Sequence, residues 1–215
     1  MIFYLRFKNH LTLLGMFALI LIANVAHAVS ITTLFATNNN NSLNGIVYFD
    51  LNVLTPGPVT ITGIATNVLS AGAPVTATAN IYVRTGTFSG HTSSASGWTL
   101  ISSGSGTVAA QDSPTTFNIS SFLLNPGVTG FAINNVNYKA AYTNGTGINQ
   151  NYSDLNIQLS TGAASNSVFS ATLNTPRVWN GTITYSIVPE PRAIALLLGI
   201  ATTGSLLAFS KILRK

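Results

Sequence analysis

The chain lacks cysteine and carries very little charge. None of its 215 residues is cysteine, and only 6% are Asp, Glu, Lys or Arg. Without cysteine there are no disulfides and no thiolate metal ligands. A chain of this length suits one domain with short terminal segments.

The formal net charge of +5 comes from the two ends of the chain. The first 28 residues sum to +2 and the last 28 to +3, whereas residues 29–187 carry three cations and three anions. Nucleic-acid binding needs a basic stripe that releases phosphate counterions. The neutral middle has no such stripe, so we expect no nucleic-acid partner.

The first 28 residues have the pattern of a secretory signal peptide. Arg6 and Lys8 precede an apolar run over 11–23, and Ala26 and Ala28 form a small-x-small site for signal peptidase. As a helix, this run is roughly 20 Å long, which is short of the roughly 30 Å hydrocarbon core of a bilayer. We expect cleavage after Ala28; the alternative is an uncleaved membrane anchor.

The last 28 residues combine three features in a fixed order. A Pro-Glu-Pro motif comes first, then an apolar run over 193–209, then a basic end. The residues concerned are Pro189, Glu190 and Pro191 in the motif and Lys211, Arg214 and Lys215 at the end. The run predicts a transmembrane helix of roughly 25 Å. The cations favour a cytoplasmic C-terminus, with the preceding domain outside the membrane.

This arrangement resembles the PEP-CTERM sorting signal, which occurs on exported proteins of bacteria that carry an exosortase and usually make exopolysaccharide. The resemblance covers residues 188–215. It implies that an exosortase cuts near the motif, and that a membrane-anchored intermediate facing the periplasm becomes a cell-surface or extracellular protein. Arg192 departs from the pattern, because small or polar residues more often follow the motif. The alternative is an ordinary C-terminal anchor behind a proline-rich spacer.

Residues 29–187 predict an all-β domain. Apolar residues recur at every second position, and Gly, Pro and Asn mark turns, among them Thr161-Gly162. The predicted strands are 46–53, 59–66, 75–84, 98–102, 115–119, 130–133, 138–143, 154–159 and 178–188. Short strands with tight turns predict a single β-sandwich of jelly-roll type.

The same alternation predicts the core of this domain. The expected core residues are Phe49, Leu51, Ile61, Ile81, Val83, Trp98, Leu100, Phe117, Ile119, Phe131, Ile133, Leu155, Ile157, Trp179, Ile183 and Tyr185. We interpret Asn180-Gly181 as a bulge within one last strand rather than as a hairpin turn. The asparagine run 38–41 is expected to be an exposed loop.

A Gly/Ser-rich loop within 81–100 stands between a strand and Trp98. Together with the stretch 177–185, this segment resembles a group of exported bacterial domains that often carry the same sorting tail. That resemblance implies no established activity.

Few residues in 29–187 are suited to catalysis or metal binding. His91 is the one histidine, and Asp50, Asp112 and Asp154 are the only carboxylates. No nucleophile-elbow motif accompanies His91, and three scattered aspartates are weak support for glycoside hydrolysis. We expect no enzyme activity, metal or cofactor. Residues 149–154 offer oxygens to calcium, although a polar turn is the favoured interpretation.

Because residues 29–187 contain so few charged side chains, we expect the oppositely charged ones to form ion pairs. Arg84 is expected to pair with Asp112, and Arg177 with Asp154 or Asp50, mainly for packing and register. A ligand contact at Arg177 is the alternative.

Two functions are consistent with these signals. The first is a structural, non-catalytic protein of the cell surface or extracellular matrix. The second is a carbohydrate-binding module for exopolysaccharide, in which exposed aromatic rings stack on sugars. The candidates for stacking are Trp98, Tyr142, Tyr152 and Trp179.

Overall fold

The alternating residues form β-strands and no helix in the computed structural model, which describes residues 28–187. The fold is therefore all-β in this part of the chain, as predicted. No helix long and apolar enough to cross a membrane occurs between residues 28 and 187. The predicted transmembrane run 193–209, the sorting motif and most of the signal segment lie outside the described residues.

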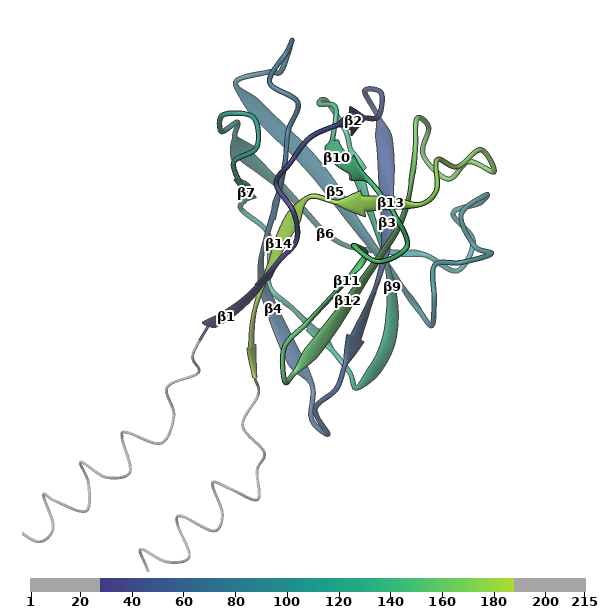
Figure 1. The fold of residues 1–215 in the computed structure, drawn as a ribbon. Helices are drawn as coiled ribbons and strands as arrows, with labels where there is room; N and C mark the ends of the chain where they lie inside the picture. Colours follow the sequence, from purple (N-terminus) through teal and green to yellow (C-terminus); the bar gives the residue numbers. More distant parts are fainter. Residues whose placement is uncertain (1–27, 188–215) are drawn as a thin grey trace, which may run out of the picture. The chain divides into compact units, whose positions relative to one another are not determined.

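The strands pair antiparallel in three sheets (Figure 1). The six-stranded sheet has the order β11 (Asn151–Ser153), β12 (Ile157–Ser165), β3 (Gly45–Val53), β9 (Gly127–Asn135), β5 (Thr76–Thr85) and β6 (Thr99–Thr107). The five-stranded sheet has the order β1 (Ala28–Thr32), β14 (Gly181–Ile187), β4 (Val59–Thr66) and β7 (Thr115–Phe117), with β8 (Phe122–Leu124) also on β4. The short sheet has the order β13 (Arg177–Trp179), β10 (Ala141–Asn144) and β2 (Asn39–Asn40).

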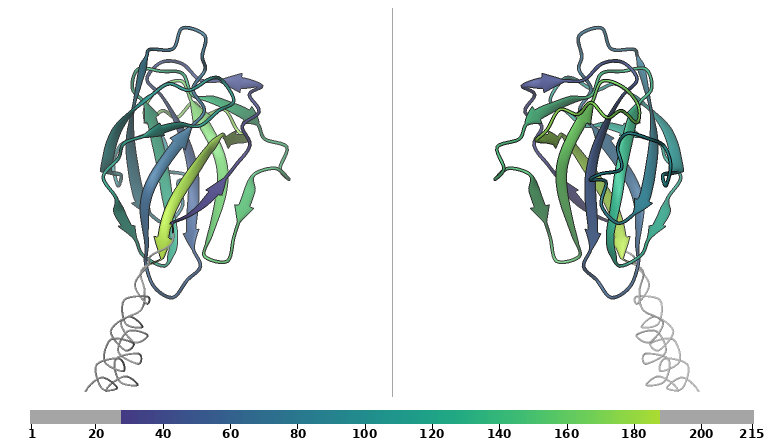
Figure 2. Two further views of the ribbon diagram at one scale, coloured as in Figure 1. Left: turned by 90° about the vertical axis from the view of Figure 1, so that its left-hand side faces the viewer. Right: turned by 90° about the vertical axis from the view of Figure 1, so that its right-hand side faces the viewer.

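The sheets enclose one main hydrophobic core, as in a β-sandwich (Figure 2). At its centre Phe49 of β3 stacks on Trp179 of β13 and on Phe131 of β9, with ring centroids 4.6 and 5.1 Å apart. Phe122 of β8 approaches Phe131 from the five-stranded sheet, at 6.3 Å. Each such pair adds about 0.5–1.5 kcal/mol beyond the area it buries, so these rings help to hold the three sheets together.

Two glycines let the large sheets meet along one side. Ser105 of β6 forms a β-bridge with Asn118, just after β7. A Cβ atom added at Gly104 would lie 2.5 Å from the Asn118 carbonyl oxygen, and one at Gly106 would lie 2.0 Å from that of Thr116. Any side chain at these positions would force the two strands apart.

The expected single last strand is wrong. β13 pairs with β10, whereas β14 pairs with β1 and β4, so the chain passes from one sheet to another at Asn180. Asn180 is buried, and its Oδ1 accepts a hydrogen bond of 3.0 Å from the Thr143 hydroxyl. A Cβ atom at Gly181 would lie 2.0 Å from the Trp179 ring. The glycine marks a change of sheet, which a pattern of alternation cannot show.

Five of the predicted core residues lie at or near the surface. Leu155 is 93% exposed because it lies in the turn before β12, which begins only at Ile157. Leu100 is 52% exposed and lies opposite Tyr82, where the β5–β6 register shifts. Val83, Trp98 and Ile119 are only partly buried. The other predicted core residues are buried.

Asparagines form structure where a loop was expected. Asn39–Asn40 is strand β2, and Asn41 is 1% exposed. The side-chain amides of Asn41 and Asn135 bond reciprocally, at 3.0 and 3.3 Å, and the Ala140 N–H donates to Asn41 Oδ1. The expected turn at Thr161-Gly162 lies inside β12, where the pairing with β3 shifts. In both places side-chain and register effects override the local composition.

The first and last strands of the domain pair with each other. Ala28 lies opposite Ser186, and Ile31 lies opposite Ile183. The two ends of the described chain therefore leave the domain side by side (Figure 1).

Replacing Gly181 with alanine should lower the free energy of unfolding by about 1–3 kcal/mol, because the new methyl group overlaps the Trp179 ring. Urea denaturation followed by tryptophan fluorescence measures this loss. Gly63→Ala on β4 is the control, since its added Cβ meets no atom closer than 3.4 Å. Equal losses in both variants would contradict the packing argument.

Candidate functional site

A second apolar cluster lies on the outer face of the six-stranded sheet. Its members alternate along β3, β5, β9 and β12 with residues that face the main core, so the sheet is covered by apolar side chains on both faces. The buried members are Ile46, Tyr48, Ala132 and Ala163, and the partly buried members are Tyr82, Phe88, Trp98, Val168, Phe169 and Leu173. We call this set the outer aromatic cluster.

The base of the cluster is one row of paired residues that crosses four strands. Tyr82 lies opposite Ala132, Ala132 opposite Tyr48, and Tyr48 opposite Ala163. Neighbouring strands are about 4.8 Å apart, so the small alanines leave space beside the tyrosine rings. Side chains from the loops 86–98 and 166–176 fill this space.

The neighbouring row holds the loop 86–98 in place. Arg84, Gly130 and Asp50 lie side by side on β5, β9 and β3. Asp50 accepts hydrogen bonds from the Thr87 hydroxyl at 2.6 Å and from the Phe88 N–H at 2.8 Å. Arg84 Nη1 donates to the carbonyl oxygen of Thr87. Arg84 on β5 and Asp50 on β3 thus both hydrogen-bond to the dipeptide Thr87-Phe88.

Phe88 lies in a slot that two glycines create. A Cβ atom at Gly130 would lie 2.8 Å from the Phe88 backbone nitrogen, and one at Gly162 would lie 2.2 Å from the Phe88 ring. The ring stacks beside Tyr48, with centroids 6.0 Å apart. The glycines are therefore needed for the close approach of the loop to the sheet.

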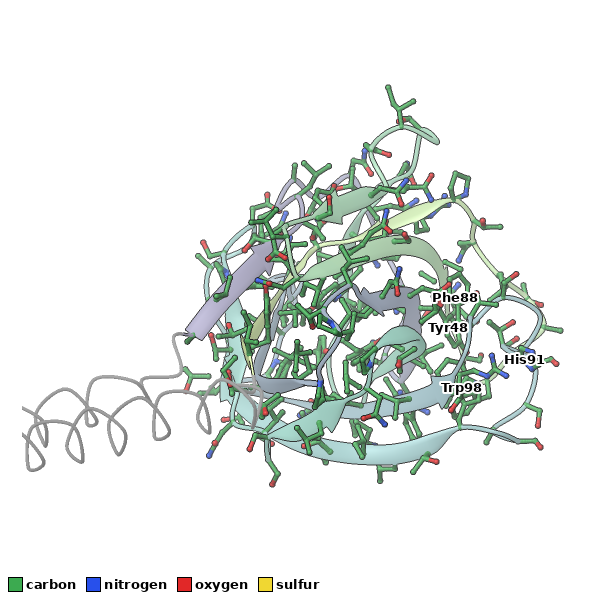
Figure 3. The ribbon with its side chains drawn as sticks, turned by 90° about the horizontal axis from the view of Figure 1, so that it is seen from below. Tyr48, Phe88, His91 and Trp98 are labelled. Atoms are coloured by element: carbon green, nitrogen blue, oxygen red, sulfur yellow. The ribbon has the colours of Figure 1, made fainter. Side chains whose placement is uncertain are left out.

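Trp98 closes the loop and remains partly exposed. Its Nε1–H donates to the His91 carbonyl oxygen at 2.7 Å. Its ring lies 5.9 Å from the rings of Tyr48 and Phe169, and the Arg84 guanidinium lies 6.0 Å above it. Figure 3 shows Trp98 and His91 near Tyr48 and Phe88, on the side of the domain away from its two chain ends.

Tyr48 lies beneath both loops. Its hydroxyl donates to the Thr92 carbonyl oxygen at 3.3 Å, and the backbone of Phe169 lies near the same hydroxyl. Burial raises the pKa of Tyr48 far above its usual value, although the Phe169 contact opposes this rise. The hydroxyl therefore stays protonated and keeps its role as a donor.

Phe169 has an unusual backbone conformation. Its φ of 47° lies in the left-handed region, which costs a non-glycine residue about 1–3 kcal/mol. The ring contacts Tyr82 edge-on at 5.2 Å. Residues held in strained backbone conformations often occur at active sites and ligand clamps. No periodicity or turn signal marks Phe169, so sequence reasoning missed it, along with Phe88 and Tyr82.

The four predicted stacking residues do not come together. Trp179 and Tyr142 are 2% and 1% exposed, so neither ring has a face open to a sugar. Tyr152 packs against the main core and donates its hydroxyl to the Asn149 carbonyl oxygen at 2.8 Å. Trp98 alone joins a cluster of partly exposed rings. Of the four candidates, only Trp98 therefore belongs to a group of partly exposed aromatic residues, and its neighbours there are Phe88 and Phe169.

Asp112 holds two loops together rather than pairing with Arg84. It accepts hydrogen bonds from the Thr37 N–H at 2.9 Å and from Asn67 Nδ2 at 2.8 Å. Bonds from Thr37 and Asn67 lower the pKa of Asp112, although desolvation opposes them. The expected Arg84–Asp112 ion pair is therefore wrong.

Asp154 caps the turn between β11 and β12. It accepts hydrogen bonds from the N–H groups of Asn156 and Ile157 and from the Tyr185 hydroxyl, at 2.8, 2.9 and 2.6 Å. Burial opposes ionisation of Asp154, but these three bonds outweigh it and lower the pKa. Burial and the bond to Asp154 raise the pKa of Tyr185 to about 12. The favoured polar turn is confirmed at Asp154, although Asn151–Ser153 just before it is strand β11.

Arg177 pairs with neither Asp154 nor Asp50. Its Nη1 donates to the Pro176 carbonyl oxygen at 2.8 Å, and its guanidinium lies 5.6 Å from the Tyr142 ring centroid. The predicted ion pairs of Arg177 are therefore wrong as well. The domain uses this cation to cover a buried aromatic ring.

His91 is exposed at the tip of the loop 86–98, as expected for a solvated loop histidine. Within residues 28–187, no three His, Asp or Glu side chains are grouped so that they could hold a metal ion. The site thus offers partly exposed rings and one guanidinium, which suit binding by stacking and hydrogen bonding.

A search with family models and a search for curated relatives found no match to this chain.

Replacing Asp50 with alanine should loosen the loop 86–98, because the Phe88 N–H and the Thr87 hydroxyl lose their acceptor. We expect the Phe88 amide to exchange about tenfold faster, equivalent to ~1.4 kcal/mol of local opening. Hydrogen exchange measured by mass spectrometry reports this change. In the control Asp154→Ala, Phe88 should keep its protection; unchanged Phe88 exchange in Asp50→Ala would refute the clamp.

Stability should fall in acid as Asp154 becomes protonated. Its folded pKa is lowered, so its contribution is complete above the unfolded pKa, near 3.9, and is lost as pH falls through the folded value. Urea denaturation between pH 7 and pH 2 measures the decline. Asp154→Asn should be less stable than the wild type at pH 7 and lose less stability below pH 4. A parallel acid decline in both proteins would contradict this role.

Proposed function

We propose that this chain is an exported, exosortase-processed protein of the cell surface or extracellular matrix. Its domain, a sandwich of jelly-roll type, has a structural and non-catalytic role. The signal-peptide pattern before Ala28 and the Pro-Glu-Pro motif followed by the apolar run and basic end support export and sorting. Signal peptidase and exosortase would be transient partners, and the run 193–209 would anchor the intermediate in the membrane.

The way the domain uses its carboxylates carries the non-catalytic part of the proposal. Asp50, Asp112 and Asp154 each accept hydrogen bonds from backbone N–H groups that fix loops or turns. Acid–base and glycosidase chemistry requires a carboxylate aimed at the substrate. These three are the only carboxylates of residues 29–187, and all are committed to holding the fold.

The position of the chain ends supports a surface role. The two chain ends of the domain lie next to each other on β1 and β14, and Tyr48, Phe88 and Trp98 of the outer aromatic cluster lie on the side away from them (Figure 3). A domain tethered through the residue after Ile187 would therefore hold its two covering loops away from the tether. This orientation suits contacts with material outside the cell.

Carbohydrate binding is the second candidate function, and the outer aromatic cluster favours it. Trp98 and Phe169 keep part of their rings exposed although they lie among apolar neighbours. Partly exposed aromatic side chains fixed by surrounding contacts are a common means of binding the apolar faces of sugars. A matrix protein that binds exopolysaccharide would combine both candidates.

The sorting proposal predicts two masses for the protein in its own bacterium. Wild-type protein from the matrix fraction should lack residues 1–28 and the apolar run 193–209. Replacing Pro189, Glu190 and Pro191 with alanines should leave the run attached, because the recognition motif is gone. Intact-mass spectrometry of membrane and matrix fractions distinguishes these forms.

Pro126→Ala, in a turn of the domain, is the control and should be sorted like the wild type. A deletion strain should also form a less cohesive matrix. Normal release of the triple-alanine variant would refute exosortase processing, and an intact matrix in the deletion strain would refute the structural role.

A further inference from the structure

We infer that the outer aromatic cluster binds an acidic polysaccharide, with Trp98 and Phe169 against sugar rings and Arg84 against a sugar carboxylate. This inference rests on the second candidate function above. It adds the location of the site and the chemical class of the ligand.

The aromatic rings of Trp98 and Phe169 are held in place in the unliganded domain. Trp98 is held by its bond to the His91 carbonyl, and Phe169 is held by its edge contact with Tyr82. Tyr48 hydrogen-bonds to the loop 86–98 from beneath and belongs to the same apolar cluster as Phe169. Groups that are already ordered lose little entropy on binding, so a modest contact area is sufficient for measurable affinity.

Arg84 gives the cluster a positive charge, and it pairs with no carboxylate among residues 28–187. One of its five N–H donors bonds to the Thr87 carbonyl, and the buried Nε has no hydrogen-bond partner within residues 28–187. Both oxygens of Asp50, the carboxylate in the same row, are bonded to Thr87 and Phe88. A guanidinium binds a carboxylate more strongly than a neutral hydroxyl because the hydrogen bonds are charge-assisted.

The surroundings favour an anionic sugar over a neutral one. The backbones of Asp50 and Arg84 are two strands apart, about 10 Å. Asp50 is the only carboxylate in the cluster's two rows, and both of its oxygens are bonded to Thr87 and Phe88. Asp112 and Asp154 are engaged in other turns. The charged group over the Trp98 ring is the Arg84 guanidinium, which attracts the negative charge of an acidic chain that stacks there.

The test compares an acidic with a neutral polymer. The full chain, purified in mild detergent, is applied to immobilised polygalacturonate and to immobilised dextran, and binding is followed by biolayer interferometry. We expect binding to polygalacturonate that weakens at high salt, and at least tenfold weaker binding to dextran. Trp98→Ala and Arg84→Gln should each weaken polygalacturonate binding about tenfold or more.

Arg177→Gln is the matched control. Arg177 also lies over an aromatic ring and also has a buried Nε without a partner, but its ring, Tyr142, is buried. This variant should bind within about twofold of the wild type. Near-ultraviolet circular dichroism checks that each variant is folded, and Trp98→Phe, which keeps a ring, should retain most binding if loss in Trp98→Ala reflects stacking.

The other outcomes distinguish failure of the acidic-polysaccharide inference from failure of the carbohydrate-binding function on which it rests. Binding to dextran that Trp98→Ala abolishes and Arg84→Gln leaves intact would overturn the acidic class but keep a carbohydrate site. Equal losses in Arg84→Gln and Arg177→Gln would reduce the effect to overall charge and overturn the site. No binding to either polymer would overturn both the inference and the carbohydrate-binding candidate.

Discussion

The six-stranded sheet is apolar on both faces, and much of the remaining structure follows from this constraint. One face closes the main core with Phe49 and Phe131, while the other carries Tyr48 and Ala132. An antiparallel sheet that is apolar on both sides needs a second cover. Here the cover consists of two loops rather than a further layer of strands or helices.

Loops packed on a sheet need contacts that hold them in place. In this domain several of those contacts are hydrogen bonds to the few charged side chains. Asp50 and Arg84 hold one loop, Asp112 joins two others, and Asp154 caps a turn. Hydrogen bonds to charged groups are worth about 1.5–3 kcal/mol each, which is large against the marginal stability of a domain. A chain with little charge thus uses its carboxylates mainly as anchors for backbone N–H groups.

The fold class and most of the core were readable from the sequence because they depend on period-two alternation. Ile61, Ile133 and Ile183 follow that rule and are buried. The failures occur where the rule breaks: Leu155 in a capped turn, and Gly181 at a change of sheet. Trp98 was expected in the core and was also one of four aromatic residues considered for sugar stacking. Its partner Phe169 comes from a distant loop, and no local pattern connects the two.

The ion pairs were not predictable for a related reason. A shortage of charge suggests that opposite charges should find each other, yet Arg84 and Arg177 lie against aromatic rings instead. Arg84 and Asp50 do not pair because Gly130, on the strand between them, leaves room for the loop 86–98. The backbone of that loop takes the hydrogen bonds of both side chains. Such spacing is a property of three strands together.

The pairing of β14 between β1 and β4 bears on the order in which the domain completes its fold. The five-stranded sheet has its last-made strand in the interior, so the sheet stays incomplete until residues 181–187 are available to pair. Such pairing between distant parts of a chain is slow, since the intervening loop must close first. Completion of the sheet thus waits for the final seven residues of the described domain, which end two residues ahead of Pro189.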